Sequence, residues 1–351
     1  MIDSILDDPI ANYPAATVAC FDPTTGALPR RKLDEALTIA FLEKLAAAGA
    51  PALLIAASTG HGHARTLEEL EEWYVAAARA SLGTTALTAL LRPEDGAAAN
   101  QRLAKLLAEL GYAVAFVRPG TGLPADTSDR QVAENMQPAV AAAAEAGLAV
   151  GLYSIPDVSG VRMTPDAAAK LLAGPGGERI VAIKVTEADY DASTLRFLKD
   201  SRLSRLKIVQ GWDPHLARAL QDGPKHDAQG RQRCGVTSGP MSFAVYQYSH
   251  ILEAAQRGDW AEVTEAQAAV TALFTAMQDD PAKFADLQRA KYIMGLGQPL
   301  TGSVTPKQFE PVLRALHQVP RAADRRRLVE SLTLMDDGPF HYGLKSFVET
   351  V

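Results

Sequence analysis

The sequence has little cysteine, no long hydrophobic run and no apolar leader. Its two cysteines, Cys20 and Cys234, are too few and too far apart for a disulfide framework or a zinc site. This cysteine usage predicts a reducing, cytoplasmic compartment. No stretch of about 18 uninterrupted apolar residues occurs, and residues 1–8 are acidic and lack the apolar core of a signal peptide. We therefore expect a soluble protein that has no membrane segment.

Clustered basic charge is scarce as well. The net charge is -6 and the pI is about 5.7, which argues against a surface for nucleic acid or an anionic membrane. One basic cluster, Arg321 with residues 325–327, stands beside acidic residues, as on a solvated helix face. The 47% hydrophobic and 22% charged content predicts a globular chain with a substantial core.

Short β-branched or apolar segments alternate with longer segments of helical period, which is typical of repeated βα units around a parallel sheet. The candidate strands are 17–21, 52–57, 86–91, 114–117, 149–155, 180–185, 206–210 and 234–237. The candidate helices between them include 33–48, 67–81, 96–110, 130–146, 165–173 and 192–199. Eight such units within residues 1–240 have the length of a closed (β/α)8 TIM barrel. An open doubly wound sheet is less favoured, because no G-x-G-x-x-G turn follows the first strand.

After Ser238 the pattern becomes helical. Helices are expected over 243–257, 260–277, 281–294 and 306–317. We therefore predict a barrel domain over residues 1–240, a C-terminal helical bundle over 241–320 and a tail over 321–351 whose packing is not predicted. Helices with an excess of apolar positions need a partner surface, so the bundle is expected to close one side of the barrel and to build a homo-oligomer interface.

Lys184 lies inside the β-branched segment 180–186, which has the pattern of a buried parallel strand. Burial of an ammonium favours the neutral amine, which is a nucleophile able to form a Schiff base with a carbonyl. The alternative is a lysine whose head emerges at the strand end and pairs with Glu187 or Asp189. The strand context alone does not separate these two interpretations.

Other reactive side chains end neighbouring strands of the predicted barrel. Tyr153 ends the fifth strand, and Ser58 and Thr59 end the second. Strand ends of a barrel converge on one mouth, so these groups are expected near Lys184. Taken alone, Tyr153 would be an ordinary half-buried aromatic and Ser58-Thr59-Gly60 an ordinary turn. Together, an amine, a phenol and a hydroxyl turn suit imine chemistry on a 2-oxoacid, with the turn holding the carboxylate.

Three segments carry a resemblance to a known family. Ala57-Ser-Thr-Gly-His-Gly-His-Ala-Arg-Thr-Leu-Glu-Glu69 resembles the pattern G-(T/S)-T-G-E-x-x-x-L-(T/S)-x-E-E of the dihydrodipicolinate synthase/N-acetylneuraminate lyase family. Tyr153-Ser-Ile-Pro-Asp-Val-Ser-Gly160 resembles its Y-N-(I/V)-P-x-x-(S/T)-G segment, and Ile183-Lys184 its I-K segment. The segments occur in the family's order and approximate spacing, and the resemblance extends from about residue 15 to about residue 316.

The resemblance implies a class I aldolase or related lyase, built as a barrel with a helical extension. Members of this family are commonly tetramers and need no metal or organic cofactor, so we expect a tetramer or dimer without either. Carried over by position, the resemblance implies Lys184 as the Schiff-base lysine and Tyr153 as the proton-transferring phenol. It also implies Ser58 and Thr59 as carboxylate-binding and proton-relay hydroxyls, with Thr59 counted as catalytic.

The chain departs from the family pattern at three places. Val158 replaces the arginine with which the synthase branch grips a substrate carboxylate, which weighs against dihydrodipicolinate synthase itself. Residues 117–122 lack the tyrosine that completes a proton relay from a neighbouring subunit in many members, and Thr121 is a possible substitute hydroxyl. His61 stands where the family has glutamate, with His63 close behind.

The two histidines leave several roles open. They are expected either as water-exposed loop residues or as groups that transfer protons to, or bind, the aldehyde part of a substrate. Metal ligation is the weakest alternative, because no carboxylate partner is evident nearby.

Further candidate residues surround the mouth. Gly60 and His61, together with Thr237 and Ser238 at the end of the eighth strand, are the additional substrate-binding candidates. Arg162 and Asp157 could reach the distal end of a substrate. For Arg118, an anion contact at the mouth and a salt bridge both remain open.

These observations predict a class I aldolase or lyase in which pyruvate is the imine-bound 2-oxoacid and an unidentified aldehyde is the other reactant. A hydro-lyase acting on a 3-deoxy-2-oxo sugar acid, or a hydratase-aldolase acting on an unsaturated pyruvate adduct, would use the same imine and enamine. A third alternative is a family member that binds a 2-oxoacid without turnover, because the relay tyrosine and the usual glutamate are missing.

Overall fold

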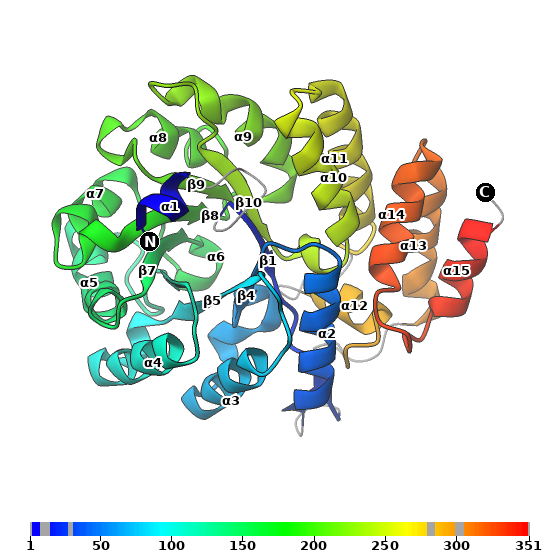
Figure 1. The fold of residues 1–351 in the computed structure, drawn as a ribbon, viewed down its shortest axis with the longest axis horizontal. Helices are drawn as coiled ribbons and strands as arrows, with labels where there is room; N and C mark the ends of the chain where they lie inside the picture. Colours follow the sequence, from blue (N-terminus) through cyan, green and yellow to red (C-terminus); the bar gives the residue numbers. More distant parts are fainter. Residues whose placement is uncertain (1, 8–14, 27–30, 279–284, 299–304, 350–351) are drawn as a thin grey trace.

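The described part of the chain forms a closed parallel barrel with a helical extension. This computed structural model describes residues 2–7, 15–26, 31–278, 285–298 and 305–349. The barrel strands are hydrogen-bonded in the order β1-β10-β9-β8-β7-β6-β5-β4, with β1 closing the ring against β4 (Figure 1). The predicted (β/α)8 TIM barrel with a C-terminal helical extension is confirmed.

The barrel strands coincide with the predicted segments except near their ends. Their bounds are β1 (Ala16–Ala19), β4 (Ala52–Ile55), β5 (Ala86–Leu91), β6 (Val114–Val117), β7 (Ala149–Ser154), β8 (Ile180–Val185), β9 (Lys207–Gln210) and β10 (Cys234–Ser238). A short antiparallel pair, β2 (Thr24–Thr25) with β3 (Lys32–Leu33), follows β1. Every residue of β8 is buried, as expected for a parallel strand covered by helices.

Helices pack around the barrel between successive strands. Their bounds are α2 (Glu35–Ala47), α3 (Leu67–Ala78), α4 (Ala97–Glu109), α5 (Asp129–Glu145), α6 (Pro156–Ser159), α7 (Pro165–Ala173), α8 (Thr194–Lys199) and α9 (Leu216–Asp222). Capping boxes at Thr66 and Ser128 begin α3 and α5, so the local sequence determines where these two helices start. The N-terminal helix α1 (Ile2–Asp7), which the sequence pattern did not indicate, buries Ile5 against residues of the barrel interior.

The remaining helices lie together on one side of the barrel (Figure 1). They are α10 (Val245–Gln256), α11 (Trp260–Thr275), α12 (Ala285–Ile293), α13 (Pro306–Gln318), α14 (Ala322–Leu332) and α15 (His341–Glu349). The helix expected over 281–294 is described from Ala285 onward, and residues 281–284 lie outside the described ranges. Within those ranges, none of the helices has both the length and the apolar character needed to cross a bilayer.

The tail from residue 321, whose packing was left open, supplies α14 and α15. Helix α14 is fastened to α10, where Arg327 Nε donates to Gln247 Oε1 at 2.8 Å and Gln247 Nε2 donates to Asp324 Oδ1 at 2.9 Å. The expectation that the basic cluster is a solvated helix face is therefore wrong for Arg327, because its guanidinium also pairs with the buried Asp324.

A buried group of charges joins the barrel to α12. Asp22, which follows β1, is completely buried and forms an ion pair with Arg65. The Lys291 Nζ of α12, also completely buried, lies 3.0 Å from Asp22 Oδ1, and Arg31 Nη2 lies 3.4 Å from Oδ2. Gln288, one helical turn before Lys291, donates to Asp22 Oδ1 at 3.4 Å and to the carbonyl oxygen of Thr59 at 3.3 Å.

Cations outnumber the carboxylate at the centre of this group. Burial alone would raise the pKa of the Asp22 carboxyl, but Lys291, His61 and Arg65 hold that pKa well below its usual range. Burial lowers the pKa of Lys291 to about 8, against the opposing effect of Asp22. Asp22 is therefore the counter-charge on which the burial of Lys291 and Arg65 depends.

We expect Asp22→Asn to destabilise the fold by about 3 to 5 kcal/mol, because it leaves buried cations without their carboxylate. Chemical denaturation measures the change. Asp336→Asn is the matched control, because it breaks an ion pair at the surface. The side chain of Asp336 is 75% exposed and that of its partner Lys44 is 44% exposed. That control should change the stability little, because water screens an ion pair between exposed side chains. Equal stability of the two variants would contradict the role assigned to Asp22.

Candidate active site

The amine of Lys184 is buried at the carboxyl end of the barrel. Lys184 is 3% exposed, and its Nζ lies 4.2 Å from the centroid of the Tyr153 ring. Strand register explains this proximity, because Tyr153 of β7 is paired directly with Lys184 of β8. Both side chains line one cavity of about 180 Å³.

Burial lowers the pKa of the Lys184 ammonium to about 7, although the carboxylate of Asp213 raises it again in part. The alternative in which Lys184 pairs with Glu187 or Asp189 is not what the structure shows. Glu187 instead forms an ion pair with Arg162 at 2.8 Å and accepts a hydrogen bond from Ser154 at 2.6 Å. A large share of the Lys184 side chains therefore carries a neutral, nucleophilic amine near neutral pH.

The phenol of Tyr153 is 2% exposed and accepts a hydrogen bond from the Thr186 hydroxyl at 3.2 Å. Burial raises the pKa of Tyr153 well above its usual value, and the hydroxyls of Thr186 and Ser58 and the guanidinium of Arg118 act against this rise. The Ser58 hydroxyl is buried and makes no hydrogen bond of regular geometry within the described structure. The neutral phenol is therefore a proton donor surrounded by groups that also stabilise its anion.

The turn at the end of β4 has an unusual backbone. Residues Ser58–Gly60 form a 3-10 turn, flanked by Ala56 and His61 with φ of 61° and 55°. These are the only non-glycine residues with positive φ in the described ranges. A left-handed conformation costs such residues about 1 to 2 kcal/mol each. It also ends β4 at Ile55, two residues before the predicted end, because Ala56 turns the chain into the site.

The absence of a side chain at Gly211 provides space for the side chain of Lys184. A Cβ at Gly211, which follows β9, would collide with the Thr186 hydroxyl and would lie 3.2 Å from Lys184 Cε. Asp213, two residues further, lines the cavity and accepts a hydrogen bond from Ser238 at 2.5 Å. Thr186, Gly211 and Asp213 were not among the predicted site residues. Their positions at the ends of β8 and β9 are the feature that could have identified them.

Asp157, predicted to reach the distal end of a substrate, lines the cavity, whereas Arg162 does not. Of the eight other catalytic and substrate-binding candidates, five line the cavity and three do not. Those that line it are Ser58, Thr59, Tyr153, Lys184 and Thr237. The three others, Gly60, His61 and Ser238, are not among the lining residues. Gly60 packs beneath the turn, where a Cβ would collide with the Trp73 indole, and Ser238 is directed to Asp213.

His61 occupies a position that the sequence did not predict, and the half-buried ring of His63 lies with its centroid 6.0 Å from that of His61. His61 is buried, and its Nδ1 lies 3.8 Å from Asp22 Oδ2, so it is neither a water-exposed residue nor part of the cavity wall. Burial lowers the pKa of His61 and lowers the pKa of His63 to about 4, so both rings are neutral at physiological pH. Their positions therefore support a structural role at the barrel mouth.

Arg118, at the end of β6, forms the salt bridge that was one of its two open alternatives. Its guanidinium pairs with Glu94, with Nη1 at 3.1 Å from Oε2, and Nη1 donates to the Pro119 carbonyl at 2.9 Å. Its side chain is completely buried, and its Nε has no hydrogen-bond partner in the described structure. Because β6 pairs with β7 at Val117 and Leu152, Arg118 comes at the level of Tyr153.

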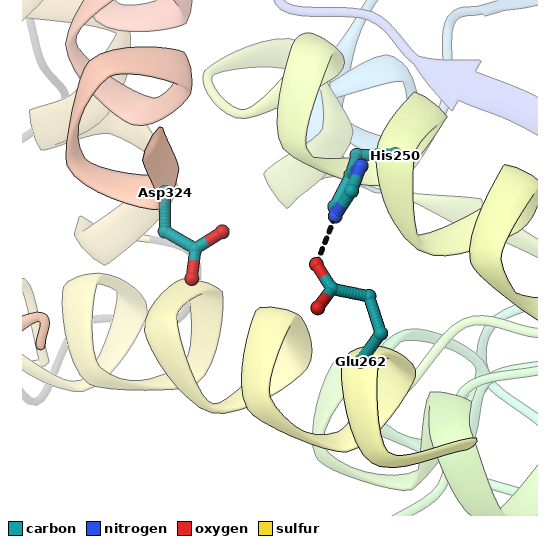
Figure 2. A group of neighbouring side chains, drawn as sticks. All are labelled: His250, Glu262 and Asp324. Atoms are coloured by element: carbon teal, nitrogen blue, oxygen red, sulfur yellow. Dashed lines mark hydrogen bonds and ion pairs between the residues drawn. The ribbon is translucent and has the colours of Figure 1, made fainter. Parts of the chain in front are cut away.

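One group of three possible metal ligands occurs in the described ranges, away from this cavity. It consists of His250, Glu262 and Asp324, from α10, α11 and α14 (Figure 2). Arg321 pairs with both carboxylates, at 3.0 Å from Asp324, and Arg327 lies 2.5 Å from Asp324. Arg321 and His250 lower the pKa of Glu262 to about 2. Guanidinium groups already balance these carboxylates, so the group is explained as an ion cluster between helices.

Solved structures with the same fold include several aldolases. A 2-keto-3-deoxygluconate aldolase variant from Sulfolobus solfataricus matches with a TM-score of 0.70 and 16% identity, over 92% of this chain and all of that one (100%). YagE from Escherichia coli K12, in complex with pyruvate, matches with a TM-score of 0.72 and 17% identity, over 88% of this chain and 99% of that one. A Ruminococcus gnavus sialic acid aldolase matches with a TM-score of 0.71 and 15% identity, over 89% of this chain and 98% of that one. At these identities the similarity shows the shared fold.

The sequence itself matches a family model over most of its length. The matched region covers residues 15–306 and therefore includes the barrel and much of the helical extension. A search of curated protein sequences gave no significant match. The family and its structural neighbours are aldolases and related lyases, which supports an enzyme. The chain therefore belongs to the dihydrodipicolinate synthetase family.

Proposed function

We propose that this protein is a class I aldolase or lyase that acts on a 2-oxoacid through a Schiff base between Lys184 and pyruvate. The observation that carries the proposal is the buried amine of Lys184, whose pKa is lowered to about 7 and whose Nζ lies 4.2 Å from the Tyr153 ring centroid inside a cavity. The pyruvate complex of YagE, which has the same fold, supports a ligand of this class.

The reaction begins with attack of the neutral Lys184 amine on the C2 carbonyl of the oxoacid. Tyr153 then protonates the departing hydroxyl, water leaves, and an imine forms. Its protonated nitrogen withdraws electrons from C3, so the C3–C4 bond can break to leave an enamine. The proton of the C4 hydroxyl passes to the Tyr153 oxygen as the aldehyde departs. Protonation at C3 and hydrolysis of the imine release pyruvate and restore the amine.

The Ser58–Gly60 turn is assigned to the carboxylate of the bound oxoacid. Ser58 and Thr59 both line the cavity that contains the Lys184 amine. Hydroxyl and backbone N–H donors there can bind the carboxylate and place C2 near the amine. A Cβ at Gly239, after β10, would lie 2.5 Å from the Thr59 Oγ1, so the glycine keeps this hydroxyl accessible.

Borohydride reduction in the presence of pyruvate should add one reduced pyruvyl group to Lys184. The matched controls are Lys291→Arg and Lys207→Arg, because both lysines are also buried. These variants should still be labelled, whereas Lys184→Ala should not. The rate of trapping should rise with pH through a pKa near 7, because the pKa of Lys184 is lowered and only the neutral amine attacks. Absence of label at saturating pyruvate, or label on Lys291, would refute the proposal.

Tyr153→Phe should slow exchange of the pyruvate methyl protons with deuterated water by roughly 10²- to 10⁴-fold, because the phenol moves protons during imine formation. Nuclear magnetic resonance follows this exchange without any aldehyde. Tyr190→Phe is the control, since its hydroxyl bonds Asp222 and lies outside the cavity. An unchanged exchange rate in Tyr153→Phe would remove the phenol from the mechanism.

Arg118→Met should slow the same exchange by about tenfold, because the phenolate form of Tyr153 loses a neighbouring positive charge. Arg118→Lys should restore part of the rate. The double variant Arg118→Met with Glu94→Gln removes the unpaired carboxylate that the single change leaves. If this double variant exchanges protons at the rate of the unaltered protein, Arg118 has only a structural role.

Analysis of the products separates the three related outcomes. Pyruvate with an aldehyde means carbon–carbon cleavage, whereas an intact carbon skeleton means dehydration or hydration by the same enamine. Binding of a 2-oxoacid without imine formation or product would favour a family member that binds without turnover. The retention of Lys184, Tyr153 and Ser58 in one cavity favours turnover.

A further inference from the structure

The cavity extends beyond the Lys184 amine toward the C-terminal helices. Phe274 of α11 and Leu287 of α12 line it together with Trp212, which follows β9. Ile155 and Pro240 also contribute to its wall. Rings and aliphatic groups from separate elements thus form the wall on which a reactant other than the imine-bound oxoacid would lie.

The charges around this wall are negative. Asp157 and Asp213 line the cavity, and Lys184 is the only cationic side chain lining it among the described residues. In the proposed function that nitrogen is bonded to the oxoacid, and it is uncharged in the enamine that meets the aldehyde.

The two arginines that follow β6 and β7 are already engaged. Arg118 pairs with Glu94, and Arg162 pairs with Glu187 at 2.8 Å. Among the described lining residues, a second carboxylate or a phosphate would therefore meet apolar groups and two aspartates and no further cation, which is costly in a partly desolvated cavity.

Resting on the proposed function, we propose that the aldehyde acceptor is uncharged and apolar beyond its carbonyl, as an aryl or alkyl aldehyde is. Its apolar body contacts Trp212, Phe274 and Leu287, and burial of that surface supplies the binding energy. The hydroxyls of a sugar-like acceptor that face these three side chains would have no hydrogen-bond partner there, which weakens its binding relative to an apolar acceptor.

The groups in the site account for every bond and proton of the proposed condensation. Enamine C3 attacks the aldehyde carbon and forms the new carbon–carbon bond, while the aldehyde oxygen takes the proton of the Tyr153 phenol. Water then hydrolyses the imine, which releases a 4-hydroxy-2-oxoacid and the free Lys184 amine. The phenolate recovers its proton from solvent, so no oxidant, reductant or further reactant is needed.

The test uses the full-length protein with pyruvate and three aldehydes: benzaldehyde, 4-formylbenzoate and glyceraldehyde. We expect kcat/KM for benzaldehyde to exceed that for 4-formylbenzoate by roughly 10²-fold, because only the carboxylate distinguishes them. Benzaldehyde should also exceed glyceraldehyde. Chromatography with mass detection measures the condensation product. Equal or faster reaction of 4-formylbenzoate or of glyceraldehyde would overturn the inference.

A variant that introduces a positive charge at the cavity sharpens the test. Gln278 is exposed at the rim of the cavity, so Gln278→Arg should fold normally and should raise the relative rate of 4-formylbenzoate at least about tenfold. Gln101→Arg, on the exposed face of α4, is the control that adds the same charge elsewhere. An equal shift in both variants would show a general charge effect and would count against the assigned wall.

Failure of the inference and failure of the proposed function give different results. A protein that traps pyruvate on Lys184 but neither condenses it with benzaldehyde nor is inhibited by benzaldehyde keeps the proposed function and loses the assigned acceptor class. A protein that never traps pyruvate loses both.

Discussion

The removal of one ammonium group from water is the constraint on which the site depends. Lys184 extends from a strand whose residues are all buried, and burial brings its pKa down to about 7. Because the pKa of Lys184 lies below its ordinary value of 10.5, burial of this lysine costs stability at every pH below that ordinary value, neutral pH included. The neighbouring Asp213 limits the decrease, which leaves the amine poised near neutral pH instead of permanently neutral.

The register of the barrel strands places the other reactive groups around the Lys184 amine. The pairing of Tyr153 with Lys184 across β7 and β8 sets the phenol beside the amine without any local sequence relation between them. The same closure brings the Ser58–Gly60 turn from β4 and Gly211 from β9 to one cavity. Each strand contributes one short segment at its carboxyl end, which is why the chemistry depends on residues spread over more than half of the chain.

The sequence predicted the barrel because each buried parallel strand is a short apolar segment that can be read locally. It predicted Lys184, Tyr153 and Ser58 because they end such strands. It did not indicate the buried group of charges around Asp22, because no pattern near Asp22 in the sequence predicts its contact with Lys291 of α12. The buried position of His61 near Asp22 was missed for the same reason, because the left-handed backbone at His61 is a tertiary feature.

The charge group also links the two parts of the proposed substrate site. Gln288 of α12 donates to both Asp22 and the carbonyl oxygen of Thr59, and its neighbour Leu287 lines the cavity. The turn assigned to the oxoacid carboxylate and the wall assigned to the aldehyde are thus held by adjacent residues of one helix. Buried charges that are satisfied only in one arrangement favour a single placement of α12. Because the proposed C–C bond formation requires reactants at a fixed separation, that rigidity would serve the proposed reaction as well as folding.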